Sequence, residues 1–176
     1  AFLVERNTPG LSFGAEEHKM GIKGSSTRQV ILENVAVPKE NLLGELGKGH
    51  IIAFQILNLG RLKLAAGCIG GCKEMVRMAS TYAQERQQFG QAIGNFGLIK
   101  SKIGQMTAET YALESAIYRL SGALDQRLEG TKTQAEKLAA IDEFVIEYSF
   151  IKVAGSEILD NTIDETLQIY GGNGFS

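Results

Sequence analysis

Two segments of the sequence carry side chains suited to binding a large phosphorylated ligand. In the first, Arg86-Gln87-Gln88-Phe89-Gly90, the arginine offers a rigid fork of N–H donors that matches phosphate oxygens. Gln88 can donate and accept hydrogen bonds, Phe89 offers a ring face or edge to a flat group, and Gly90 lets the chain turn. An arginine at the end of a helix can also bind the helix's own terminal carbonyls, so this segment alone leaves both roles open.

The second segment, Gln168-Ile169-Tyr170-Gly171-Gly172-Asn173-Gly174-Phe175, offers bare backbone in place of charge. Its glycines would let a ligand approach the main chain closely, with Gln168 beside them on the last turn of a helix. A glycine-rich run is also an ordinary helix stop and turn. It is not the Gly-x-Gly-x-x-Gly signature of a dinucleotide fold, because no strand precedes it. Together the two segments predict two halves of one cofactor site.

A third candidate is Asn58-Leu59-Gly60-Arg61, where a charged side chain interrupts an apolar stretch. Arg61 could extend to the surface along its aliphatic stem, or it could contact a polar group of a substrate near the cofactor. Glu16-Glu17 is expected to be a solvated turn, and neither histidine belongs to a triad pattern. Cys68 and Cys72 lie four apart on one helix face, so we expect them in the core, with no disulfide and no metal site.

Three long helical patterns must position these segments. Apolar residues recur every three or four positions over residues 49 to about 82, about 95 to 128, and 133 to 171. The first pattern would form a helix about 50 Å long, and its Gly67 and Gly71 suggest a place where another backbone comes close. Long helices with short connections pack antiparallel, so we predict a mainly α chain built as an up-down bundle. Such bundles usually close with four helices, so a fourth is expected from outside the sequence or from a partner subunit.

Residues 1–46 have the pattern of short strands and turns. We expect strands over Phe2–Val4, Gln29–Glu33 and Asn34–Val37, the last stopping at Pro38 because proline cannot donate to a strand ladder. So few strands cannot bury both faces of a sheet. The predicted domains are therefore the C-terminal part of a larger β domain over 1–46 and a helical bundle, incomplete at its C-terminus, over 47–176.

Charge and hydropathy narrow the range of partners. The 18 basic residues are balanced by 20 acidic ones, which gives no reason to expect nucleic acid as a partner. No run of 18 uncharged apolar residues exists, so no membrane span is expected.

In this order and on these elements, the motifs resemble the acyl-CoA dehydrogenase family over the whole chain. The segments similar to the end of that family's middle β-barrel domain are Phe2 to Gly10, Met20 to Thr27 and Val37 to Gly44. The segments similar to signatures of its C-terminal helical domain are Arg86 to Ile99 and Gln168 to Gly174. Two segments, Leu57–Arg61 and Asn95–Ile99, are most similar to the very-long-chain branch.

The resemblance implies a flavoenzyme that shares its cofactor between subunits. In this family FAD takes the β hydrogen of a fatty acyl-CoA as hydride while a glutamate removes the α proton, and FAD lies across a subunit boundary of a homodimer or homotetramer. The implied cofactor-binding residues are Arg86, Gln88 and Phe89 at the diphosphate of the neighbouring subunit's FAD, and Gln168, Gly171 and Gly172 at its adenosine end. The implied substrate-binding residues, at the CoA end of the acyl-CoA, are Asn58 and Arg61.

The catalytic glutamate is the one element of the family that this sequence does not match. One of the family's two positions for it corresponds to Gly60, which has no side chain to abstract a proton. The other lies roughly two dozen residues beyond the Gly-Gly-Asn-Gly run, past Ser176. We therefore expect no catalytic residue within the sequence and a base beyond Ser176. Such a base works in a closed apolar site, where desolvation raises the pKa of its carboxyl group.

The implied activity is α,β-dehydrogenation of fatty acyl-CoA in β-oxidation, with electrons passed to an electron-transfer flavoprotein. Two alternatives stay open: an acyl-CoA oxidase-like flavoenzyme whose flavin is reoxidised by oxygen, and a non-catalytic helical assembly or scaffold protein. The implied location is the cytoplasm of a bacterium or the mitochondrial matrix. We expect the isolated chain to be inactive and to bind FAD poorly, because the base and the strands that cover the flavin would lie outside it.

Overall fold

The computed structural model describes all residues, 1–176, and divides them into two compact units, Ala1–Ala53 and Phe54–Ser176. Each unit has its own internal contacts and is described separately. The domain boundary predicted between residues 46 and 47 stays a prediction.

The first unit is built on one antiparallel hairpin. Strand β1 (Leu11–Glu16) pairs with β2 (Arg28–Leu32), with Leu11 opposite Leu32 and an irregular register between Phe13 and Glu16. A 3₁₀ turn, η1 (Lys39–Asn41), follows. The strand expected near 29–33 is confirmed as β2, while β1 was not expected.

Two other expected strands are wrong. At Phe2–Val4 the backbone forms an isolated bridge between Phe2 and Leu42, and the Leu3 N–H donates to the Asn41 carbonyl, but the facing residues belong to the end of η1 and no strand extends from them. Asn34–Val37 is not a strand either, since Asn34 has a φ of 52° and turns the chain out of extended geometry.

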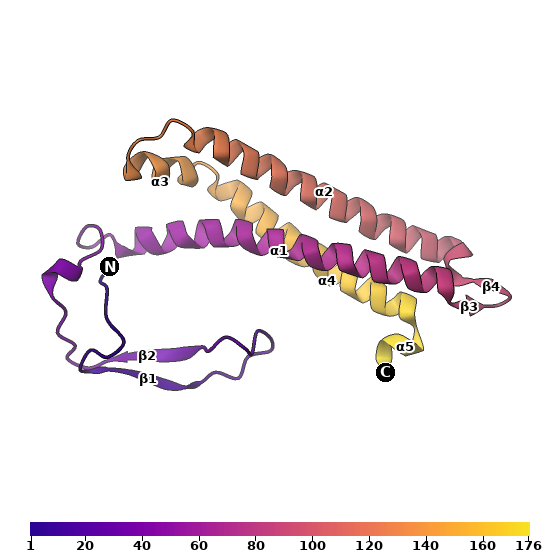
Figure 1. Ribbon diagram of the computed structural model, residues 1–176, viewed down its shortest axis with the longest axis horizontal. Helices are drawn as coiled ribbons and strands as arrows, with labels where there is room; N and C mark the ends of the chain where they lie inside the picture. Colours follow the sequence, from indigo (N-terminus) through magenta and orange to yellow (C-terminus); the bar gives the residue numbers. More distant parts are fainter. The chain divides into compact units, whose positions relative to one another are not determined.

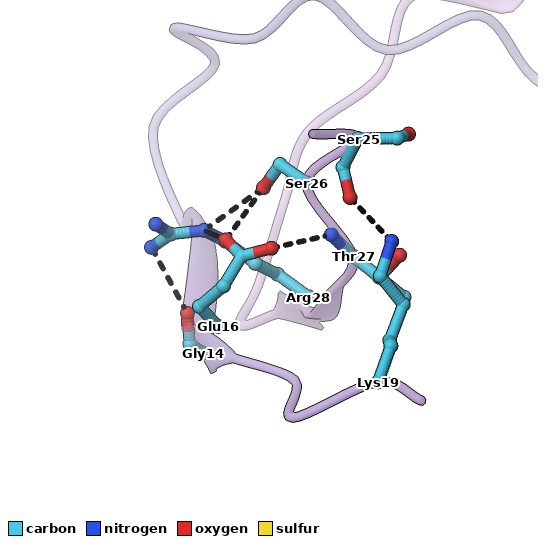
Figure 2. A network of polar contacts seen from close by, with 7 residues as sticks. All are labelled: Gly14, Glu16, Lys19, Ser25, Ser26, Thr27 and Arg28. Carbon is cyan, nitrogen blue, oxygen red and sulfur yellow. Dashed lines mark hydrogen bonds and ion pairs between the residues drawn. The ribbon is translucent and has the colours of Figure 1, made fainter. Parts of the chain in front are cut away.

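Glu16 and Glu17 are exposed, as expected, but Glu16 is the last residue of β1 rather than part of a turn, and its side chain bonds across the loop between β1 and β2 (Figure 2). The Glu16 carboxylate accepts hydrogen bonds from the Ser26 hydroxyl at 2.7 Å, the Thr27 N–H at 2.8 Å and the Arg28 guanidinium at 2.8 Å. The Lys19 ammonium donates to the Ser25 carbonyl across the same loop. The hydrogen bonds from Ser26 and Thr27, with Arg28 beside them, hold the pKa of Glu16 below its ordinary value of 4.5.

The second unit is a bundle of long helices, as the sequence predicts (Figure 1). Its helices are α1 (Gly49–Glu85, which begins in the first unit), α2 (Gly97–Leu128), α3 (Gln134–Asp142), α4 (Val145–Tyr170) and the single turn α5 (Gly172–Phe175). Between α1 and α2 lie the short strands β3 (Gln87–Gln88) and β4 (Gln91–Ala92) and the 3₁₀ turn η2 (Ile93–Asn95). Helices α1 and α2 run antiparallel, and so do α2 and α4.

Two apolar clusters hold the bundle together. The larger one joins α1, α2 and α4 through Ala65, Ile69, Leu113, Ile117, Leu120, Leu124, Tyr148 and Ile151. The smaller one lies nearer the end of α1 and contains Ala79, Ala83, Met106 and Ile169. Cys68 and Cys72 are buried free thiols, as expected. Burial of this apolar surface is the main force that keeps the helices side by side.

Of the three glycines Gly67, Gly71 and Gly155 in the long helices, Gly155 is the one that faces the backbone of another helix, and Gly67 and Gly71 do not. A Cβ on Gly155 would lie 3.2 Å from the Ala65 Cα of α1, so a larger residue there would push α1 and α4 apart by a few tenths of an ångström. Gly71 faces the end of the Leu159 side chain, and Gly67 faces open space. The close contact predicted at Gly67 and Gly71 does involve α1, but it lies at Ala65 of that helix and the glycine is Gly155 of α4.

The third predicted helix is in fact two. Its expected capping box is confirmed, since the Thr133 side chain accepts from the Glu136 N–H and the Glu136 side chain accepts from the Thr133 N–H. Helix α3 then ends at Asp142, and α4 begins only at Val145. At the break, Glu143 accepts two hydrogen bonds from the Arg127 guanidinium, both at 2.6 Å, and Phe144 leaves helical geometry with φ −105° and ψ 21°.

Helix α1 is long and apolar enough to cross a membrane, judged by length and composition only. Core helices of soluble proteins meet the same criterion, so the finding is weak evidence for a span. The sequence-based expectation of no membrane span, which considered only uncharged runs, stays a prediction.

Candidate functional site

The Arg86 segment forms a tight hairpin at the end of α1. The Arg86 N–H donates to the Tyr82 carbonyl at 2.9 Å, and the Ile93 N–H donates to the Arg86 carbonyl at 2.9 Å. Phe89 and Gly90 have φ values of 54° and 80°, and positive φ at both central residues is the requirement of a type I′ hairpin turn. Gly90 turns the chain as expected.

Phe89, at the tip of this hairpin, has a backbone conformation that is unusual for a phenylalanine. Positive φ is costly for a bulky residue with a Cβ, and such backbone strain is typical of functional positions. Phe89 is 90% exposed, and its ring and the Phe96 ring are nearly perpendicular, with centroids 6.1 Å apart. A strained backbone therefore presents an aromatic side chain to the outside.

The second segment ends α4 through glycine-specific geometry. Gly171 has φ 57° and ψ −129°, a combination that residues with a Cβ rarely adopt. A Cβ on Gly174 would lie 2.6 Å from the Leu167 carbonyl oxygen, so this position also requires glycine. Nothing lies within 4 Å of a Cβ built on Gly171 or Gly172, and both residues are exposed. A ligand could therefore approach the backbone here without meeting a side chain.

Tyr82 and Tyr170 join the two segments. Their rings stack with centroids 4.1 Å apart and planes 11° from parallel. The Tyr82 hydroxyl donates to the Tyr170 carbonyl at 3.4 Å and accepts from the Asn173 side-chain amide at 2.9 Å. The hairpin after α1 and the turn after α4 therefore lie at the same end of the bundle (Figure 1).

Sequence reasoning missed this tyrosine pair. Tyr82 lies one helical turn before Arg86, and Tyr170 lies two residues after Gln168, so both lie next to candidate residues. The hydrogen bond between them spans 88 residues of sequence, and no local pattern reveals a contact of that range.

The polar side chains of the two segments have no partners within the chain. Arg86, Gln88 and Gln168 are exposed, and none of their side chains makes a hydrogen bond or ion pair with another residue. The alternative in which Arg86 binds the carbonyls at the end of its own helix is therefore not adopted. An unpaired guanidinium, two free amides and bare glycine backbone suit a ligand that carries phosphates and a polar ring.

The third candidate is a linked pair inside α1. The Arg61 guanidinium donates to the Asn58 amide oxygen at 2.6 Å, and Asn58 is only 5% exposed. The helix from Arg61 to its end at Glu85 measures about 36 Å at 1.5 Å per residue. The structure therefore brings Asn58 and Arg61 together but places them far from Arg86 of the same chain.

Gly60 lies between Asn58 and Arg61 and is exposed on the helix surface. A Cβ built there would meet nothing within 4 Å. The position has room for a longer side chain but supplies no acid or base.

Comparison with known proteins identifies the family. The family model described as "Acyl-CoA dehydrogenase, C-terminal domain" matches residues 47–176. The chain belongs to the acyl-CoA dehydrogenase family. Its resemblance to that family, inferred from the motifs, is thereby confirmed.

Three relatives of this acyl-CoA dehydrogenase family chain are informative. A probable acyl-CoA dehydrogenase of Bacillus subtilis is 51% identical over 180 residues, covering 99% of this chain and 30% of the relative. The mitochondrial very long-chain specific acyl-CoA dehydrogenase of Homo sapiens is 41% identical over 175 residues, covering 99% of this chain and 25% of the relative. The crystal structure of an acyl-CoA dehydrogenase complexed with FAD from Bacillus anthracis superposes with a TM-score of 0.91 at 52% identity, covering 99% of this chain and 31% of that one.

These relatives confirm the mainly α fold and the similarity to the very-long-chain branch. The chain spans only about a third or less of the length of each relative.

Proposed function

We propose that the chain is part of an FAD-dependent acyl-CoA dehydrogenase that oxidises fatty acyl-CoA to the α,β-unsaturated product in β-oxidation. The observation that supports this most is the Arg86 hairpin joined to the Gly171–Gly172 turn by the Tyr82–Tyr170 stack. Membership of the family and the FAD-bound Bacillus anthracis relative support the choice of cofactor.

The exposed groups at this end of the bundle fit a flavin dinucleotide. The Arg86 fork would bind the diphosphate, with Gln88 and Phe89 beside it. Gln168 and the open backbone at Gly171 and Gly172 would hold the adenosine end. FAD supplies the hydride acceptor when bound, and these residues position it.

The cofactor would be shared between subunits of a homodimer or homotetramer. Arg61 and the end of α1 at Glu85 are about 36 Å apart along the helix axis. A cofactor bound at Arg86 and a substrate bound at Asn58 and Arg61 of the same subunit would therefore be held at points far apart on α1. A cofactor shared between subunits accounts for this separation. Arg86 would then bind the FAD whose flavin ring lies at the substrate of the neighbouring subunit.

Asn58 and Arg61 would orient the CoA end of the substrate. Asn58 is buried and accepts from Arg61, so it fixes the direction of the guanidinium. A fixed guanidinium loses less conformational entropy on binding a polar group than a free one. The pair would thus act on substrate binding rather than on the chemical step.

We place the catalytic base beyond Ser176, because Gly60 supplies no carboxylate at the other position that the family uses. The sequence of the full-length protein tests this directly. A Glu-Gly-Thr-like segment roughly two dozen residues after Ser176 would support the enzyme, whereas its absence would favour the non-catalytic scaffold. The isolated chain would be inactive in either case, so a purified 176-residue chain that dehydrogenates an acyl-CoA would contradict this placement.

The electron acceptor would be an electron-transfer flavoprotein, in a bacterial cytoplasm or a mitochondrial matrix. The test is to add palmitoyl-CoA to the full-length protein and follow the absorbance of oxidised flavin. Anaerobic bleaching on addition of substrate, followed by reoxidation by electron-transfer flavoprotein without hydrogen peroxide, is expected. Stoichiometric peroxide in air would instead support the oxidase, and no bleaching would overturn the proposal.

A further inference from the structure

We propose that Tyr82 is a positioning residue for the cofactor: its side chain holds the Gly171–Gly174 turn, while its main chain holds the Arg86 hairpin. The inference rests on the proposed function and adds a residue to it. Tyr82 itself need not touch the cofactor.

Tyr82 is bonded to both segments through different atoms. Its carbonyl accepts from the Arg86 N–H at 2.9 Å, which ties the start of the hairpin to α1. Its hydroxyl donates to the Tyr170 carbonyl at 3.4 Å and accepts from the Asn173 amide at 2.9 Å. Tyr170 and Asn173 are the residues that flank Gly171 and Gly172. Tyr82 is thus bonded to the hairpin through its main chain and to the turn through its side chain.

The turn needs such an anchor because of its composition. Gly171, Gly172 and Gly174 have unusual backbone freedom, and a turn rich in glycine loses much entropy when it is fixed. Helix α4 is anchored on one side of this turn by buried Ile169, whereas the Phe175 side chain on the other side is 97% exposed. The Tyr82 hydroxyl is the group outside α4 and α5 that bonds to the turn on both sides of its first two glycines.

The ring and the hydroxyl of Tyr82 have separable roles. The ring stacks on Tyr170 and contributes to packing, whereas the hydroxyl bonds only to the turn. Replacing Tyr82 with Phe keeps the stack and releases the turn. Replacing Asn173 with Ala breaks the same link from the other side.

The test measures the Kd of FAD for the deflavinated full-length protein, the Kd of a non-reactive acyl-CoA analogue, and Tm. We expect Tyr82→Phe to weaken FAD binding roughly five- to tenfold, because it removes both neutral hydrogen bonds of the hydroxyl, of which the one at 3.4 Å is long and weak. Binding of the analogue should change little, because Asn58 and Arg61 lie far away on α1. The Tm of the deflavinated protein should also change little, because phenylalanine keeps the stack on Tyr170. Tyr148→Phe is the matched control, since the Tyr148 hydroxyl is buried without a partner and its loss should leave the Kd of FAD unchanged.

The double variant Tyr82→Phe/Asn173→Ala separates positioning from direct contact. If both residues act through the same bond, the double variant should bind FAD no more weakly than the weaker single variant. Additive losses would overturn the inference, because they would mean that Asn173 acts on FAD independently of Tyr82. Asn173→Ala also serves if Tyr82→Phe fails to fold, and an unchanged Kd in that variant would overturn the inference.

Arg86→Ala in the same series distinguishes failure of this inference from failure of the proposed function. If Arg86→Ala weakens FAD binding and Tyr82→Phe leaves it within twofold, or lowers Tm alone, Tyr82 is merely structural and the inference is wrong. If neither variant changes FAD binding, the proposed cofactor site is itself wrong.

Discussion

The Arg61 guanidinium is fixed by Asn58, whose buried amide oxygen accepts its hydrogen bond at 2.6 Å one turn earlier on α1. A buried acceptor cannot exchange its partner for water at no cost. Arg61 is therefore held in one orientation before any substrate binds.

Asn58→Ala should release Arg61 and weaken substrate binding. Hydrogen bonds to charged groups contribute about 1.5–3 kcal/mol, so we expect KM for acyl-CoA to rise about tenfold or more, with a smaller change in kcat. Steady-state kinetics of the full-length protein would measure both. Gln105→Ala, which removes an exposed hydrogen bond to Glu109 on α2, is the control and should leave both constants unchanged. An unchanged KM in Asn58→Ala would exclude this role.

Gly155→Ala should destabilise the bundle. The new methyl group would press on the Ala65 backbone at 3.2 Å, and overpacking of this kind costs about 1–3 kcal/mol. Higher helix propensity offsets about 1 kcal/mol of this cost. We therefore expect the free energy of unfolding in urea to fall. Gly67→Ala faces open space on α1 and should raise it by up to about 1 kcal/mol. Equal effects of the two substitutions would show that α1 and α4 are not closely packed at Gly155.

Thr133→Ala should weaken the start of α3. The Thr133 side chain accepts from the Glu136 N–H at 3.2 Å, and loss of an N-cap side chain typically costs about 1 kcal/mol. Urea unfolding measures the loss. Lys132→Ala is the control, because only its backbone N–H bonds to Glu136 and that bond survives the substitution. A loss of equal size in the two variants would rule out the capping box as its cause.

The loop between β1 and β2 should loosen in acid. The pKa of Glu16 is lowered by the Ser26 hydroxyl, the Thr27 N–H and Arg28, so the folded loop favours the ionised carboxylate. Its stabilising effect is fully present above the unfolded pKa, near 4.5, and is lost as pH falls through the lower folded pKa. Hydrogen exchange at the Thr27 N–H should therefore show less protection below about pH 4 than a pH correction predicts. In Glu16→Gln this extra pH dependence should vanish, and its persistence would assign it to another group.

The features predicted correctly from sequence are those that local patterns encode. The long helices follow from apolar periodicity, and the α3 start follows from the Thr133–Glu136 spacing. The break at Glu143 was missed, because the ion pair with Arg127 at the end of α2 is a tertiary contact that periodicity does not report.

In the candidate cofactor site, too, the features encoded by local sequence were predicted and the tertiary contacts were not. Its two segments were recognised by their residue types, but the Tyr82–Tyr170 stack between them was not, since the partners lie on different helices. The strained φ of Phe89 was likewise invisible, because positive φ is expected of glycine and seldom of phenylalanine. The close helix contact was predicted at Gly67 and Gly71 instead of Gly155, because sequence alone does not show which glycine faces a neighbouring helix.

The central claim is that Arg86 binds the FAD diphosphate, and the Kd of FAD in Arg86→Ala tests it most directly. Loss of a charge-assisted hydrogen bond of about 1.5–3 kcal/mol should weaken binding to the deflavinated full-length protein by roughly 10- to 150-fold. Arg77→Ala, which removes an exposed ion pair with Glu74 on the same helix, should bind FAD like the unaltered protein. An Arg86→Ala protein that retains FAD as tightly as the Arg77→Ala control would contradict the account.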